Sequence, residues 1–87
     1  MKTIHTQAYQ QLCALLVSHR KVSGLSQHRL AQVLGRPQSF IAKIESHERR
    51  LDVIELLEIA EVLNINLCDL IGSLQSTLSK PEEHTQS

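Results

Sequence analysis

Residues 25–44, LSQHRLAQVLGRPQSFIAKI, decide the fold of this 87-residue chain. Ser26 is a favourable N-cap for a helix over residues 27–34. Gly35 follows, and glycine is the residue that most easily adopts the left-handed conformation ending a helix. The periodicity then restarts and predicts a second helix from Gln38 to about Ser46. The stretch therefore predicts two short helices joined by a tight turn.

The small and apolar residues of this stretch lie at the offsets that two crossing helices require. Ala31 allows the helices to approach closely, and Gly35 permits the sharp turn between them. Ile41 and Ile44 would then pack the second helix against the first. The full set is Gln27, Leu30, Ala31, Leu34, Gly35, Ile41 and Ile44. Residues at these spacings predict a helix-turn-helix over residues 26–46.

Three further helices are expected around this motif. Residues 6–22 carry apolar side chains at helical spacing, and Asp52 with Glu55 has the spacing of a capping box for a fourth helix. The inward stripe of that fourth helix is expected to be Val53, Leu56, Leu57, Ala60 and Leu63. A fifth stripe runs over residues 67–78. With no period-two strand pattern, we expect one all-α, five-helix domain over residues 8–78, after an N-terminal arm (1–7) and before a disordered polar tail (79–87).

Composition excludes several classes of protein. Tyr9 and Phe40 are the only aromatic residues, so no stacking platform for single-stranded nucleic acid can be built. The spacing of Cys13 and Cys68 fits neither a zinc site nor a disulfide scaffold, and we expect both to be buried. Glycine-rich nucleotide motifs are absent, and no apolar run is long enough to span a membrane. We expect a cytoplasmic, nucleoid-associated protein without cofactor or metal.

The formal net charge of zero hides two oppositely charged halves. Residues 19–50 hold seven Lys and Arg against two Glu, a net charge of +5. Residues 51–87 hold seven acids against one Lys, a net charge of −6. The basic segment contains the predicted helix-turn-helix, which fits a nucleic-acid partner.

The second helix of the motif presents a polar face with small side chains. At about 100° per residue, Gln38, Ser39, Ala42, Lys43 and Ser46 share one side, opposite Phe40, Ile41 and Ile44. Gln can pair with adenine, Lys with guanine, and Ser with several base edges in the major groove. We expect Phe40 to pack beside Ile44. Arg36, Lys43, Arg49 and Arg50 are available to neutralise phosphates, and the amides that begin the preceding helix can hold another.

In these residues, and over about residues 9–74, the chain resembles the lambda-repressor-like, XRE-type helix-turn-helix family. The resemblance implies a five-helix fold whose third helix enters the major groove, commonly as a dimer on a pseudo-palindromic operator. It assigns Gln27 to phosphate contact, Gln38, Ser39 and Lys43 to bases, and Ser46 and Arg49 to the sugar-phosphate backbone. It also pairs Arg20 with Glu45 as a structural ion pair.

Two positions depart from that family pattern. Pro37, expected to open the third helix, stands where a Ser or Thr cap is common, so a hydroxyl contact to phosphate is lost. His47 replaces a frequent Gly after that helix, which puts the geometry of the helix end in doubt.

The acidic half has more apolar surface than one small core needs. Ile54, Ile59 and Val62 lie beyond the predicted stripe, and together with Leu67, Ile71, Leu74 and Leu78 they suggest a homodimer through helices four and five. Such a dimer would place two recognition helices about 34 Å apart; the alternative is a monomer in which these residues complete the core. The leading functional hypothesis is a DNA-binding repressor. The alternatives are an antitoxin-like module whose acidic half binds a protein such as a toxin and, least favoured, an enzyme, because no catalytic spacing organises the His and acidic residues.

Overall fold

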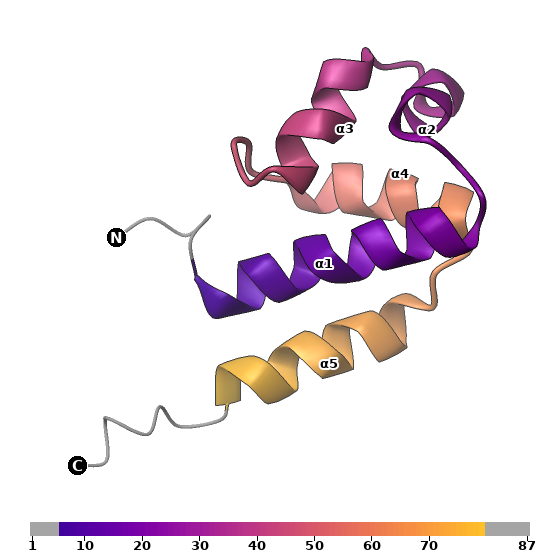
Figure 1. The fold of residues 1–87 in the computed structure, drawn as a ribbon. Coiled ribbons are helices and arrows are strands. Elements are labelled where there is room, and N and C mark those ends of the chain that lie inside the picture. Colours follow the sequence, from indigo (N-terminus) through magenta and orange to yellow (C-terminus); the bar gives the residue numbers. More distant parts are fainter. Residues whose placement is uncertain (1–5, 80–87) are drawn as a thin grey trace.

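The computed structural model describes residues 6–79, which form five α-helices joined by short turns and contain no strand (Figure 1). The helices are α1 (Gln7–Val22), α2 (Gln27–Leu34), α3 (Gln38–Glu45), α4 (Val53–Leu63) and α5 (Leu67–Ser79). The all-α class and the five helices are thus as predicted. Helix α1 begins inside the range expected for the arm, and α5 takes in the first residue of the expected tail. Residues 1–5 of the expected arm and 80–87 of the expected tail lie outside the described residues.

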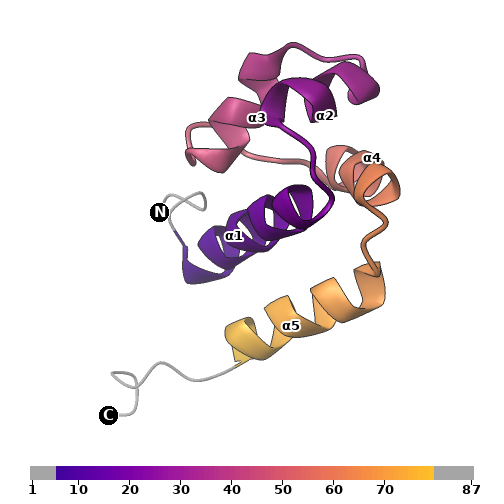
Figure 2. The ribbon, with the colours of Figure 1, turned by 45° about the vertical axis from the view of Figure 1, so that its right-hand side comes forward.

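Helix α1 is the central element of the bundle. Helix α5 runs antiparallel to it on one side, while α2, α3 and α4 lie on the other (Figures 1 and 2). The Thr77 hydroxyl of α5 donates a hydrogen bond to the Gln11 side chain of α1. No helix within residues 6–79 is both long and apolar enough to cross a membrane. Because α5 packs on the far side of α1, one face of the helix-turn-helix is left uncovered.

The helix ends follow the predicted capping chemistry. The Ser26 hydroxyl accepts a hydrogen bond from the Arg29 amide at 3.0 Å, and Gly35 ends α2 with φ of 71°. At the start of α4, the Asp52 carboxylate accepts from the Glu55 amide at 2.8 Å. The Glu55 carboxylate accepts in return from the Asp52 amide at 3.0 Å, which completes the capping box.

Both ends of α3 carry an uncommon residue. Pro37 occupies the N-cap and makes no side-chain cap, so it precedes the helix and is not its first residue. At the other end Ser46 is the C-cap, and His47 adopts a left-handed conformation with φ of 65°. His47 therefore keeps the backbone geometry that glycine usually provides, at a steric cost to the fold.

The core is mainly aliphatic and takes residues from all five helices. Its buried members are Leu12, Cys13, Leu16, Leu30, Ala31, Phe40, Ile41, Ile44, Leu56, Ile59, Ala60, Leu63, Ile65 and Leu70. Cys13 is buried as expected, but the same expectation for Cys68 is wrong, because that side chain is exposed. Cys68 follows the inward-facing Leu67 by about 100° around α5, which turns it toward solvent.

The predicted inward stripe of α4 is partly wrong. Val53 and Leu57 are 68% and 46% exposed, whereas Ile59, expected outside the stripe, is only 2% exposed. The buried residues of the helix are Glu55, Leu56, Ile59, Ala60 and Leu63. Compared with the prediction, α4 is rotated about its axis so that the Glu55 carboxylate faces the core. Hydrophobic periodicity alone predicts that this residue faces solvent.

Two matched substitutions test the left-handed helix ends. Replacing His47 by Gly removes a Cβ from a left-handed backbone and should raise the free energy of unfolding by up to about 1 kcal/mol. Replacing Gly35 by Ala adds a Cβ at φ of 71° and should lower it by about 1 kcal/mol. Denaturant unfolding of both variants beside wild type measures the effects. A loss of stability in His47→Gly would show that the imidazole itself stabilises the turn.

Candidate nucleic-acid interface

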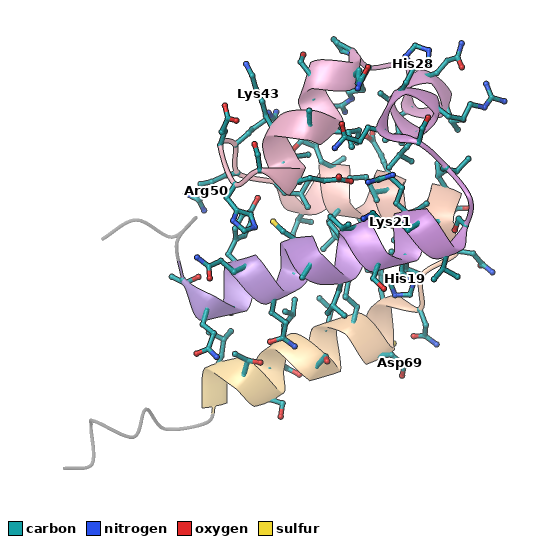
Figure 3. The ribbon with its side chains drawn as sticks, in the orientation of Figure 1. His19, Lys21, His28, Lys43, Arg50 and Asp69 are labelled. Atoms are coloured by element: carbon teal, nitrogen blue, oxygen red, sulfur yellow. The ribbon has the colours of Figure 1, made fainter. Side chains whose placement is uncertain are left out.

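The outer face of α3 is polar, exposed and free of large apolar side chains. Gln38, Ser39, Lys43 and Ser46 are exposed, and Ala42 is half-buried between them. The opposite face carries Phe40, Ile41 and Ile44, which are all buried in the core. Figure 3 shows the Lys43 side chain extending from α3 away from α1 and α5. The two faces divide as the periodicity predicts.

Gln27 connects the start of α2 to both ends of α3. Its side-chain amide donates to Glu45 Oε1 at 2.8 Å, and its oxygen lies 3.5 Å from the Gln38 amide nitrogen. The second distance is long for a hydrogen bond. In the free protein, the Gln27 donor expected to contact phosphate is thus already paired with Glu45.

Arg20 and Glu45 form a two-point ion pair between α1 and α3. Arg20 Nε and Nη2 donate to the two Glu45 oxygens at 2.7 and 3.0 Å. Arg20 Nη1 also donates to the Leu25 carbonyl at 2.8 Å, just before α2. The two side chains are only 10% and 12% exposed. One arginine therefore holds the end of α1, the loop before α2 and the last residue of α3.

A second charged cluster lies around Glu55. Arg49 Nη1 and Nη2 donate to its two oxygens at 2.8 and 2.9 Å, and Arg36 Nη1 donates to Oε2 at 3.3 Å. Arg36 Nη2 also donates to Glu58 at 2.9 Å. The hydrogen bonds from Arg49, opposed by burial, lower the pKa of Glu55 to about 2, so it is ionised at neutral pH. Those same bonds raise the pKa of Arg49.

The guanidinium groups of both arginines in this cluster lie over the ring of Phe40. The guanidinium carbons of Arg36 and Arg49 lie 4.5 and 4.7 Å from the centre of its ring. The ring is 7% exposed and belongs to the core, as expected for a packing residue. Stacked cations of this kind gain electrostatic attraction from the ring face.

Tyr9 anchors the segment after α3 to α1. Its hydroxyl donates to the Arg49 carbonyl at 3.0 Å. Burial, together with the neighbouring Cys13, raises the pKa of Tyr9 to about 12, and burial also raises the pKa of the Cys13 thiol. Both groups are thus neutral at physiological pH and act as structural residues.

The remaining candidates for phosphate contact differ in whether their side chains already have a partner within the protein. Lys43 and Arg50 are exposed and form no ion pair within residues 6–79. The Ser46 hydroxyl donates to Glu48 at 2.7 Å, so it is already engaged. No group of three or more His, Cys, Asp or Glu suited to a metal occurs in the described part of the chain.

Sequence reasoning missed the partners of Arg36 and Arg49. Both were expected to face phosphate alone, yet each is bound to Glu55. Glu55 was recognised only as a capping residue, because its other partners lie 6 and 19 positions away in the sequence. The one available signal was a carboxylate in the middle of the apolar run Val53-Ile54-Glu55-Leu56-Leu57.

The fold and the exposed face of α3 define a helix-turn-helix protein, and comparison with known proteins agrees. A family model described as Helix-turn-helix matches residues 18–70. The chain is similar to the control protein C.SmaI of Serratia marcescens, with 32% identity over 54 residues, which is 62% of this chain and 64% of that protein. The chain thus spans less than two thirds of that relative's length.

A solved structure of an XRE-family like protein from Pseudomonas syringae pv. tomato str. DC3000 is also similar, with 42% identity and a TM-score of 0.78. That match covers 91% of this chain and 94% of the solved one. The chain belongs to the XRE-type helix-turn-helix family of DNA-binding transcription regulators.

We expect the ion pair between Arg20 and Glu45 to contribute more to the free energy of unfolding than the exposed Lys43 does. Arg20→Ala leaves a nearly buried carboxylate with only Gln27 and should cost about 3 kcal/mol. Lys43→Ala removes an exposed side chain and should change stability by less than about 0.5 kcal/mol. Thermal unfolding of the two variants measures the difference. Equal melting temperatures would contradict a structural role for the pair.

Proposed function

We propose that this protein is a sequence-specific regulator of transcription that binds double-stranded DNA as a dimer and acts as a repressor. The supporting observation is the outer face of α3, which is exposed, polar and free of large apolar side chains, while its opposite face is buried in the core. A protein of this function acts at the nucleoid, without enzymatic activity or a cofactor.

The proposed base contacts follow from side-chain chemistry. Gln38 can donate to and accept from adenine, and Lys43 can donate to the guanine acceptors O6 and N7. Ser39 can bond either kind of edge. Ala42, half-buried between them, allows close approach or contact with a thymine methyl group.

The proposed phosphate contacts surround this face. The first amides of α2, beside Gln27, present donors to an anion. Ser46 and the arginines Arg36 and Arg49 flank α3, and Arg50 adds a further exposed charge. Such contacts fix the register of a protein on the duplex, while the base contacts supply specificity.

Selection of binding sites from random duplex DNA tests the proposal. We expect one sequence with two-fold symmetry to be enriched. Lys43→Ala should weaken binding to that sequence by about tenfold, a loss of about 1.4 kcal/mol, and should make the slope of log K against log salt shallower by about 1. If no sequence is enriched and binding does not depend on salt, the protein does not bind DNA specifically.

The dimer is proposed through the outer faces of α4 and α5. Five of the large exposed apolar side chains lie there, namely Val53, Ile54, Leu57, Ile71 and Leu78. Beside them, a largely apolar groove of about 260 Å³ is lined by residues of α1, α4 and α5, including Leu56, Leu74 and Leu78. A two-fold axis through this surface would leave both α3 faces free for adjacent major grooves. Ile59 is excluded from this surface, because it is buried in the core.

Sedimentation equilibrium tests the dimer. Wild type should have twice the monomer mass at micromolar concentration, and Ile54→Glu should shift the mass toward the monomer by placing charge in the apolar contact. Val22→Glu, at a residue 85% exposed on the end of α1, is the matched control and should remain dimeric. If wild type is a monomer, the exposed apolar surface of α4 and α5 is better explained as a binding surface for another protein.

A further inference from the structure

Glu55 connects both flanks of the recognition helix to α4. Arg36 lies just before α3 and Arg49 just after it, and both donate to this one carboxylate at 2.8 to 3.3 Å. The same two guanidinium groups also lie over the ring of Phe40, a residue of α3. The carboxylate therefore fixes the positions of two arginines that border the proposed DNA-binding face.

The charges of this cluster cancel in the free protein. Two arginines face Glu55 and Glu58, and the Glu55 side chain is only 9% exposed. An arginine without such a partner would attract any phosphate, whatever the base sequence. With Arg36 and Arg49 neutralised, fewer charges beside α3 attract phosphate irrespective of base sequence, and Arg50 remains as the exposed charge on this flank.

The cluster is nevertheless open to a competing anion. The Arg36 and Arg49 side chains are 30% and 38% exposed. Arg20, paired with Glu45, is 10% exposed and closed to phosphate. Arg36 and Arg49 can therefore give up part of their hydrogen bonding to Glu55 and bind a phosphate instead, when other contacts hold that phosphate nearby.

We propose that Glu55 is a positioning residue that determines DNA specificity, holding Arg36 and Arg49 so that they bind phosphate only in the register fixed by the base contacts of α3. This inference rests on the proposed sequence-specific binding to DNA. Glu55 does not touch DNA itself; it acts through the two arginines. Its effect is to suppress binding to arbitrary sequences more than binding to the true site.

Glu55→Gln tests this role with little change in shape. Glutamine retains an oxygen that can accept from the Asp52 amide, so the capping box at α4 is kept. The negative charge shared by the two arginines is lost. Glu61→Gln is the matched control, because it makes the same charge change at an exposed position of α4 that has no ion pair in the described structure.

The measurement is the ratio of affinities for the selected site and for random duplex at one salt concentration. In Glu55→Gln, affinity for random duplex should rise about threefold and the ratio should fall about tenfold. Glu61→Gln should shift both affinities by the same factor and leave the ratio unchanged. A loss of folded protein alone would lower both affinities together, so the rise in random binding separates positioning from stability.

Arg49→Lys provides a second test that does not alter Glu55. Lysine keeps the charge but loses the two-point bond to the carboxylate and the planar contact with Phe40. The ratio should again fall, and this variant decides the question if Glu55→Gln does not fold. An unchanged ratio in the folded variants, or an equal fall in Glu61→Gln, overturns the role of Glu55 while specific binding by wild type stands. A wild-type ratio near one overturns the proposed function and this inference together.

Discussion

The geometry of the recognition helix depends on the ion pair between Arg20 and Glu45. Helix α3 has only eight residues, too few to be stable or oriented by itself. Its inner face packs on the core, and the ion pair adds a directional polar connection to α1. Glu45, the last residue of α3, receives two hydrogen bonds from Arg20, which also holds the Leu25 carbonyl before α2. The relative positions of both motif helices are thereby fixed from α1.

A nearly buried ion pair is a costly way to join helices. Both charges lose water, and an apolar contact of equal volume is often as stabilising. The pair differs from such a contact in its direction, because a guanidinium meets a carboxylate well in few orientations. Gln27 donates a further hydrogen bond to the Glu45 carboxylate and lies beside Gln38. The buried pair is thus connected to the first residue on the outer face of α3.

The parts of this architecture that depend on local sequence could be predicted, and the parts that depend on tertiary electrostatics could not. Ser26, Gly35 and Asp52 act within a few residues of themselves, so their chemistry defines helix ends directly. The rotation of α4 depends on Glu55 facing inward, which requires Arg36 and Arg49 from elsewhere in the chain. Hydrophobic periodicity treats a glutamate as an outward residue and therefore misplaced Val53, Leu57 and Ile59.

The same long-range ion pairs bring together charges that are segregated along the sequence. The basic segment 19–50 and the acidic segment 51–87 are separate in sequence, but the fold pairs Arg36 and Arg49 of the first with Glu55 and Glu58 of the second. The uncompensated charge near α3 is then carried mainly by Lys43 and Arg50. Attraction to phosphate is independent of sequence, so a smaller free charge reduces binding to arbitrary DNA. Under the proposed function, discrimination between sequences then falls to the polar side chains on the outer face of α3, a helix that Glu45 ties to α1 and whose flanking arginines Glu55 ties to α4.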